Sequence, residues 1–284
     1  MLKAYYRLTK PGIIYGNLVS AVAGFLLASR GHVDLGLFAA MVAGTALVIA
    51  SGCVLNNYTD RDVDQKMART RQRALVCGTI SGFSALAYGT VLGVLGFAAL
   101  VLFTNPLTVL VGAIGFVDYV VFYAIAKRLG PAGTIVGSIS GATPLVAGYV
   151  AVTDRIDAGA VLLFLIMVIW QMPHFYAIAI FRLKDYAAAG LPVLPVKKGA
   201  RAAKISIIAY IGAYIVAATA LTAFGYTGYT YALVMAGVGL AWLHKALGGL
   251  AAKDDAVWAR KLFGFSLIVL LTFCAMIAAD TWLP

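Results

Sequence analysis

The sequence predicts an all-α protein, a polytopic membrane bundle of nine transmembrane helices. Three observations lead to this prediction. Of the 284 residues, 62% are hydrophobic and 12% charged, and the mean hydropathy is +0.93, so lipid must solvate most of the surface. The apolar residues gather in nine runs, each near the roughly 20 residues that a spanning helix requires. The basic residues are concentrated in alternate connections between these runs.

Polar or turn-forming breaks separate the runs, among them Lys127 to Pro131 and Thr153 to Asp157. The shortest break is Thr104-Asn105-Pro106, whose asparagine and proline are typical of a turn. We expect spans at 13–29, 37–56, 83–103, 105–126, 132–152, 158–180, 204–224, 229–249 and 262–282.

The distribution of Lys and Arg predicts the orientation. With the N-terminus in the cytoplasm, 20 of the 22 basic residues fall on the cytoplasmic side, and only Arg30 and Arg155 lie opposite. The positive-inside rule therefore places the N-terminus in the cytoplasm and the C-terminus on the other side. The formal net charge of +11 then reflects loops that orient the protein, and we expect no nucleic-acid partner. The longest loops, after the second and sixth spans, predict chemistry on the cytoplasmic side.

An aspartate-rich segment follows the second span. If it continues the helix, Asn56, Asp60 and Asp64 lie four apart on one face, with Asn57 adjacent and Asp62 on the opposite side. Two carboxylates and two amides without soft ligands suit Mg²⁺, which binds one or two carboxylates together with phosphate oxygens. By charge alone, a loop in which the aspartates pair with nearby arginines is an equal alternative. The shared face at a helix end favours binding of metal and phosphate.

Cationic groups accompany this segment. Four follow it directly, namely Lys66, Arg69, Arg71 and Arg73, and such a cluster beside a carboxylate-held Mg²⁺ would bind a diphosphate from two sides. At the end of the fourth span, Tyr123 and Lys127 are four residues apart, with Arg128 next. Taken alone, these three residues are more typical of an interfacial aromatic with snorkelling cations.

A second group of polar residues lies in and after the sixth span. His174 sits within an apolar run, where an ionisable group is a functional candidate; the alternative is a hydrogen-bonded interior histidine. Arg182, Lys184 and Asp185 follow. On a continuous helix His174 and Asp185 would share a stripe but lie roughly 16 Å apart, too far to bind one ion together.

Taken together, these segments resemble the UbiA superfamily of intramembrane prenyltransferases. Its motif Asn-Asp-x-x-Asp-x-x-x-Asp corresponds to Asn56-Asn57 with Asp60 and Asp64, where Asn57 replaces the first Asp, and its Tyr-x-x-x-Lys motif to Tyr123 and Lys127. The chain is most similar to the branch that farnesylates protohaem IX. The segments that carry this likeness run nearly end to end: Leu8 to Gly12, Arg69 to Arg73, Pro173-His174-Phe175, Lys184-Asp185-Tyr186 and Gly190 to Val196. Ala74 stands where that branch has proline.

The resemblance implies a single prenyltransferase domain over residues 1–284. Its reaction would move a farnesyl group from farnesyl diphosphate to the 2-vinyl group of haem b, with addition of water and release of diphosphate. The implied cofactor is Mg²⁺, held by Asn56, Asp60 and Asp64. Implied catalytic residues are Asp60, Asp64, Lys127, His174 and Asp185. Implied substrate-binding residues are Asn56, Asn57, Arg69, Arg73, Tyr123, Arg128, Arg182 and Lys184.

Several points stay open under this resemblance. His174 would either orient haem or handle a proton. Only Asp185 remains of the superfamily's second aspartate-rich motif, which leaves the ligands of a second metal undefined. The implied location is the bacterial inner membrane, with a terminal oxidase or haem A synthase as a further contact.

Two alternatives differ in function. A related enzyme of the superfamily would prenylate the aromatic ring of a quinone precursor, but the Gly190 to Val196 stretch and the reduced second motif favour haem. A transporter would place its polar residues along a path and show internal repeats. The sequence shows no convincing repeat, and its charges cluster at one interface.

Overall fold

The computed structural model describes residues 1–283 and is built of helices, with no strand in that range. Nine helices of the described residues are long and apolar enough to span a membrane, which confirms the predicted fold class. They are α2 (Pro11–Ser29), α3 (Leu35–Thr59), α5 (Gly82–Phe103), α6 (Pro106–Val117) continued through the π-helical η1 (Asp118–Phe122) into α7 (Tyr123–Leu129), α8 (Gly133–Thr153), α9 (Ala158–Phe181), α11 (Leu194–Ala223), α12 (Tyr229–Leu247) and α13 (Asp255–Ala279).

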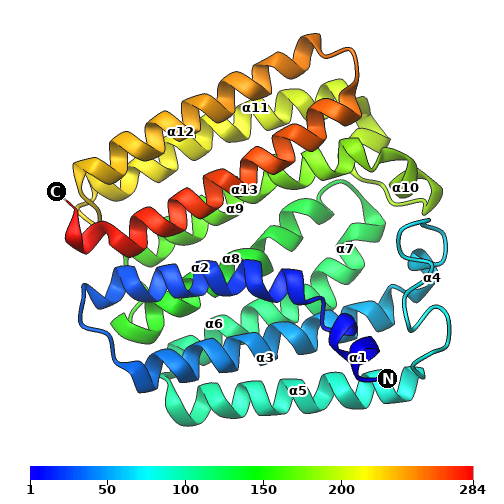
Figure 1. Ribbon diagram of the computed structural model, residues 1–284, viewed down its shortest axis with the longest axis horizontal. Helices are drawn as coiled ribbons and strands as arrows, with labels where there is room; N and C mark the ends of the chain where they lie inside the picture. Colours follow the sequence, from blue (N-terminus) through cyan, green and yellow to red (C-terminus); the bar gives the residue numbers. More distant parts are fainter. Residues whose placement is uncertain (284) are drawn as a thin grey trace.

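The spans run side by side, and the short helices lie at one end. These are α1 (Leu2–Leu8), α4 (Arg61–Asp64) and α10 (Leu183–Ala188), at the right of Figure 1, whereas the C-terminus lies at the opposite end. Two 3₁₀ turns complete the chain, η2 (Gly248–Ala251) and η3 (Asp280–Trp282). The end that carries α1, α4 and α10 is the one that receives most of the basic residues.

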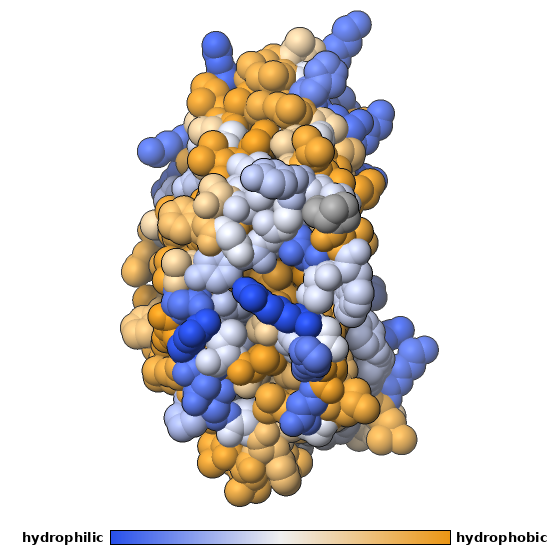
Figure 2. Space-filling model, turned by 90° about the vertical axis from the view of Figure 1, so that its left-hand side faces the viewer, coloured by the Kyte–Doolittle hydropathy of each residue, from blue (hydrophilic) through white to orange (hydrophobic). Residues whose placement is uncertain are grey.

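Helix α9 packs against α8, α11 and α13, while α2 packs against α8 and α3 against α5. The largest cluster of buried apolar side chains is built mainly from α8, α9, α11, α12 and α13. Outward-facing side chains such as Leu102, Phe103 and Leu233 are exposed, as expected where lipid is the solvent. Figure 2 views the end that carries the C-terminus, where hydrophilic side chains gather around the middle of the face.

The short break between the third and fourth spans is confirmed. Asn105 caps α6 by accepting a hydrogen bond from the backbone N–H of Thr108 at 2.9 Å, and its amide donates to the carbonyl of Val150 at 2.8 Å. Pro106 occupies the first turn of α6, where its missing N–H leaves no bond unmade. The turn is therefore fixed both by its own chemistry and by α8.

Two helices begin well before the predicted spans. Helix α11 starts at Leu194, with a local break at Gly199 (φ 80°), and α13 starts at Asp255. Some of the basic residues that indicated loops lie on these helical extensions, namely Lys197, Lys198, Arg201, Arg260 and Lys261, and Lys and Arg are good helix formers outside the bilayer. Lys204, where the predicted span begins, joins the two helices, because its ammonium is 2.5 Å from a carboxylate oxygen of Asp255.

The aspartate segment is not a straight continuation of its span, as the spacing argument assumed. Helix α3 ends at Thr59, Asp60 has φ −92° and ψ 4°, and α4 begins at Arg61. Backbone bonds from Asp60 to Asn56 (3.0 Å) and from Asp64 to Asp60 (2.8 Å) still link the turns. The chain therefore bends at Asp60. Helix α9 likewise stops at Phe181, so His174 and Asp185 lie on separate helices.

Candidate active site

A cavity of about 720 Å³ lies among α2, α3, α6–α7, α8, α9 and α13, within the roughly 300–1,000 Å³ usual for small-molecule sites. Its charged lining residues come from the helix ends near α1, α4 and α10. They are Lys10, Asp60, Asp64, Arg69, Arg73, Lys127 and Arg182. The remaining lining is mainly apolar and aromatic and belongs to the spans. The cavity therefore offers a charged end and an apolar body.

The cavity also reaches the lipid-facing surface. Of its lining residues, Gly12, Ile13 and Gly16 on α2 and Leu267 on α13 are exposed. These two helices pack against each other. A second, almost wholly apolar groove follows the same helices and is lined by Tyr15, Leu18, Val19, Val22, Ala23, Leu271, Cys274, Ala275 and Ala278. The cavity thus opens along the line where α2 meets α13.

At the charged end, Asp60 faces Lys127 of α7. The ammonium nitrogen lies 2.6 Å from Oδ1 and 2.7 Å from Oδ2 of Asp60, so it contacts both carboxylate oxygens. Both side chains are largely buried, at 14% and 11% exposed. Asp60 is therefore held by Lys127 through a largely buried ion pair that involves both carboxylate oxygens.

Asp64 is held by Arg73 from the connection that follows α4. One guanidinium nitrogen of Arg73 donates to Asp64 Oδ2 at 2.6 Å and to Asn57 Oδ1 at 3.0 Å. The amide of Asn57 in turn donates to the carbonyl of Leu8 at 2.8 Å. Asn57 does not line the cavity; it ties the aspartate segment to α1 and orients Arg73.

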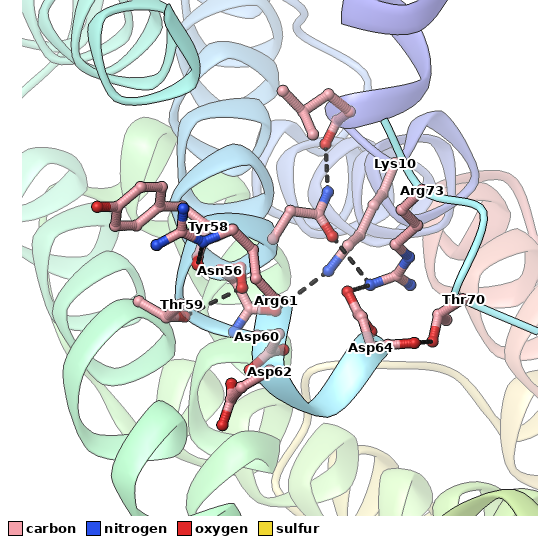
Figure 3. Close-up of polar contacts among 12 residues, drawn as sticks. Lys10, Asn56, Tyr58, Thr59, Asp60, Arg61, Asp62, Asp64, Thr70 and Arg73 are labelled. Atoms are coloured by element: carbon pink, nitrogen blue, oxygen red, sulfur yellow. Dashed lines mark hydrogen bonds and ion pairs between the residues drawn. The ribbon is translucent and has the colours of Figure 1, made fainter. Parts of the chain in front are cut away.

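Lys10 joins this group, although the sequence analysis counted it only among the basic residues of the cytoplasmic side. It precedes Pro11 at the start of α2 with a left-handed backbone (φ 53°), and its ammonium donates to Asn56 Oδ1 at 3.1 Å. Burial lowers the pKa of Lys10 to about 8. Figure 3 shows Lys10, Asn56, Asp64 and Arg73 turned toward one another around the bend. The signal that could have identified Lys10 is the Lys-Pro-Gly sequence just before a span.

Asp62 lies outside the cavity and has a different partner. Both of its carboxylate oxygens accept hydrogen bonds from the guanidinium of Arg128, at 2.7 and 2.8 Å, which also donates to the carbonyl of Thr59. These hydrogen bonds hold the pKa of Asp62 at about 2. Arg128 does not line the cavity either. The pair fastens α7 to the bend between α3 and α4.

Two tyrosines form one wall beside the charged end. Tyr119 and Tyr123 stack with ring centroids 5.8 Å apart and planes 10° apart, and the Lys127 ammonium lies 5.0 Å from the centre of the Tyr123 ring. Both rings line the cavity. The π-helical turn η1 lies at this point, held by Asp118, which accepts a hydrogen bond from the Ser140 backbone at 3.1 Å.

The opposite wall comes from α9 and α13. His174 stacks on Trp170 with ring centroids 4.8 Å apart and lies 4.8 Å from the Phe263 ring centre. Phe175 and Phe181 continue this aromatic lining. His174 therefore faces the cavity from between aromatic rings and makes no ion pair with the described residues.

The residues after α9 divide into two groups. Arg182 lines the cavity and has only a loose ion pair with Asp185, at 3.8 Å. Asp185 and the exposed Lys184 do not line it. Tyr186 does line the cavity, and burial raises its pKa. The structure thus brings most of the sequence-predicted residues together but leaves Asn57, Arg128, Lys184 and Asp185 outside the lining.

The charged end fits a divalent ion bound together with phosphate. Within residues 1–283 no group of three or more His, Cys, Asp or Glu side chains is placed to hold a metal ion, so a divalent ion at this end would need further oxygen ligands. The Nδ2 amide of Asn56 is buried without a hydrogen-bond acceptor, and as a donor it suits a phosphate oxygen. An oxygen-rich site with two carboxylates and surrounding cations is what Mg²⁺ with a diphosphate requires.

Comparison with known proteins places the chain in a family. Residues 17–279 match the UbiA prenyltransferase family. The chain is 52% identical to a protoheme IX farnesyltransferase of Sodalis glossinidius over 100% of its own length and 96% of that protein. A solved digeranylgeranylglyceryl phosphate synthase superposes with a TM-score of 0.81 at 18% identity, covering 99% of this chain and 98% of the other. A UbiA homologue from Archaeoglobus fulgidus, bound to GPP and Mg²⁺, gives 0.74 at 16% identity, covering 94% and 99%. The chain belongs to the UbiA prenyltransferase family.

Proposed function

We propose that this protein transfers a farnesyl group from farnesyl diphosphate to the 2-vinyl group of haem b, with addition of water, giving haem O and diphosphate. The observation that carries the proposal is the 52% identity, over the full chain, to a protoheme IX farnesyltransferase. The geometry supports it, since one cavity combines a charged end with a large apolar body that opens to lipid. Both substrates have the same division into anionic and apolar parts.

The charged end would bind the diphosphate. Asn56, Asp60 and Asp64 would hold Mg²⁺, which when bound neutralises part of the diphosphate charge and so favours its departure. The ammonium groups of Lys10 and Lys127 lie beside these residues. Because they are buried, their attraction for a diphosphate oxygen is only weakly screened. They would therefore stabilise the charge that grows on the leaving group.

The tyrosine wall would face the allylic carbon. When the bond between C1 of the farnesyl group and oxygen breaks, its electron pair leaves with the diphosphate, and a cation remains. Tyr119 and Tyr123 lie next to the charged end, where their ring faces would attract this cation. The apolar lining keeps water away until the new carbon–carbon bond has formed.

The α9–α13 wall would receive the porphyrin. The terminal carbon of the vinyl group donates its π electrons to C1, so the positive charge moves to the carbon attached to the porphyrin ring. Water bonds there and releases one proton to solvent, which leaves a hydroxyl group. Arg182, loosely paired and lining the cavity, would bind a haem propionate.

The membrane setting completes the proposal. The protein is an integral membrane protein with nine apolar helices in the described range. We place it in the bacterial inner membrane with the N-terminus in the cytoplasm, since 20 of 22 basic residues then face that side. Its product would pass to a terminal oxidase or to a haem A synthase.

The test is a product assay read by mass. Purified protein with Mg²⁺ and farnesyl diphosphate receives haem b in one sample and 4-hydroxybenzoate in another. We expect haem that has gained one farnesyl group and one hydroxyl, and no prenylated benzoate. The opposite result would assign the chain to the aromatic-ring prenyltransferases. Geranylgeranyl diphosphate in a third sample measures the preference for prenyl length.

A further inference from the structure

The hydrogen bond between His174 and Ser266 defines which ring nitrogen of the histidine carries a proton. Ser266 Oγ lies 2.6 Å from the carbonyl of Phe263 and 2.8 Å from His174 Nδ1. A carbonyl only accepts, so the single hydroxyl proton of Ser266 points to Phe263. His174 Nδ1 must therefore be the donor toward Ser266, and Nε2 carries a free lone pair.

Neighbouring residues of α9 and α13 hold both Ser266 and the imidazole ring of His174 in place. The indole N–H of Trp170 donates to the backbone carbonyl of Ser266 at 3.0 Å, so the residue that accepts from His174 is itself fixed on both sides. The imidazole ring is further enclosed by Trp170 and Phe263, each with its ring centre 4.8 Å away. Nε2 makes no hydrogen bond to the described residues and belongs to a side chain that lines the cavity.

Two roles are possible for such a lone pair, and the surroundings distinguish them. A histidine that takes up a proton is stabilised by a carboxylate on its other nitrogen, but Ser266 is neutral and no ion pair involves His174 in the described part of the chain. An imidazolium on this apolar wall would be an uncompensated buried charge. A histidine that binds a metal stays neutral and donates its other N–H to a nearby acceptor, which is the arrangement present here.

We infer that His174 Nε2 is the axial ligand of the haem iron while haem is bound as substrate, and that Ser266 is the residue that positions it. The inference rests on the proposed haem substrate. Such a bond would hold the haem iron against α9 and so limit the positions that the porphyrin can take in the cavity. Tyr119 and Tyr123 line the same cavity, so the reacting vinyl group would be held in the space that they share.

The experiment is a haem titration followed by absorption spectroscopy, with no turnover required. Wild-type protein in lipid nanodiscs should bind haem b with the spectrum of a histidine-ligated haem. His174→Ala should lose that spectrum and bind haem at least about tenfold more weakly, because a ligand bond is lost. Ser266→Ala should keep the ligand but weaken haem binding on the order of tenfold, as for other supporting partners of metal ligands. Added imidazole should restore the spectrum of His174→Gly.

Two controls isolate the iron bond. His244 is exposed and outside the cavity, so His244→Ala should behave as wild type. Iron-free protoporphyrin IX should bind equally to wild type and to His174→Ala, which also shows that the variant is folded. An unchanged haem spectrum in His174→Ala would overturn the inference, and so would equal losses of haem and protoporphyrin affinity. Failure of the wild type to bind any haem would instead remove the proposed function.

Discussion

Asp60 and Asp62 are two residues apart and carry the same carboxylate side chain, but one is largely buried and the other is exposed. Asp60 is 14% exposed at the charged end of the cavity and paired with the largely buried Lys127, whereas Asp62 is 59% exposed and paired with Arg128. We expect Asp60→Asn to lower Mg²⁺-dependent turnover by about a hundredfold or more, as loss of transition-state charge stabilisation does. The identical change at position 62 should alter turnover less than about threefold, since exposed ion pairs contribute little. Turnover is measured by product mass, and equal losses in both variants would contradict the assignment.

Lys10 yields a second prediction at this scale. Its buried ammonium has one hydrogen-bond partner, Asn56, and is free to bind an anion. Lys10→Met should reduce kcat/KM for farnesyl diphosphate roughly tenfold to a hundredfold, the equivalent of one charge-assisted hydrogen bond. Thermal stability should not fall, because removing a buried charge relieves its desolvation. Lys3→Met, at an exposed position, is the matched control; an unchanged kcat/KM in Lys10→Met would exclude the role.

The sequence predicted much of the site at the residue scale, and its omissions have physical reasons. Helical spacing identified Asn56, Asp60 and Asp64 because the bend at Asp60 preserves the backbone bonds between turns. It could not identify Lys10, since a position 46 residues away in the chain enters only through tertiary packing. Spacing did name Asn57, but not its contacts with Leu8 and Arg73, which also depend on tertiary packing.

Among the helices, α2 and α8 cross at unusually close range through two glycines. A Cβ on Gly148 would overlap the carbonyl oxygen of Ala21, and one on Gly24 would overlap that of Leu145. Small residues at such crossings allow backbones to approach within the bilayer. The contact sets the position of α2, and with it Lys10, relative to the cavity.

Gly148→Ala should therefore destabilise the protein by about 1–3 kcal/mol, the usual effect of overpacking. The matched change is Gly212→Ala, on α11, where a Cβ would meet nothing within 4 Å and where alanine favours the helix. The measurement is the midpoint of thermal unfolding in detergent. A similar midpoint for the two variants would mean that the crossing is looser than described.

Element boundaries were the least predictable level. Hydropathy reports where a helix leaves lipid, not where its hydrogen bonds end, so the starts of α11 and α13 were placed too late. The boundary at Thr104 to Pro106 was predicted correctly, because the helix cap and the proline are local signals in the sequence.

For the whole molecule, the nine spans could be predicted from the composition and length of the apolar runs, because the length of a span is set by the thickness of the bilayer. The orientation of the protein in the membrane is a separate prediction, and a native cysteine of the chain can test it. Cys77 is exposed in the connection between α4 and α5, while Cys53 and Cys274 are buried. We expect a membrane-impermeant maleimide to label Cys77 in inside-out vesicles and not in intact spheroplasts.

The reciprocal variant completes this test. In a Cys77→Ala background, Arg30→Cys lies in the connection between α2 and α3, where the native residue is exposed, and should be labelled in spheroplasts. Labelling of Cys77 from the outer face would reverse the orientation and move the charged end of the cavity out of the cytoplasm.

The opening along α2 and α13 also determines the medium in which this protein meets its partners. A prenyl tail can enter, and a farnesylated porphyrin can leave, sideways, without either crossing an aqueous layer. The rate at which the protein meets these molecules then depends on their number per area of membrane. They diffuse in the two dimensions of the bilayer, not through the volume of the cell. Any protein of the same bilayer that uses the product would then receive it by lateral diffusion, whatever the volume of the surrounding cytoplasm.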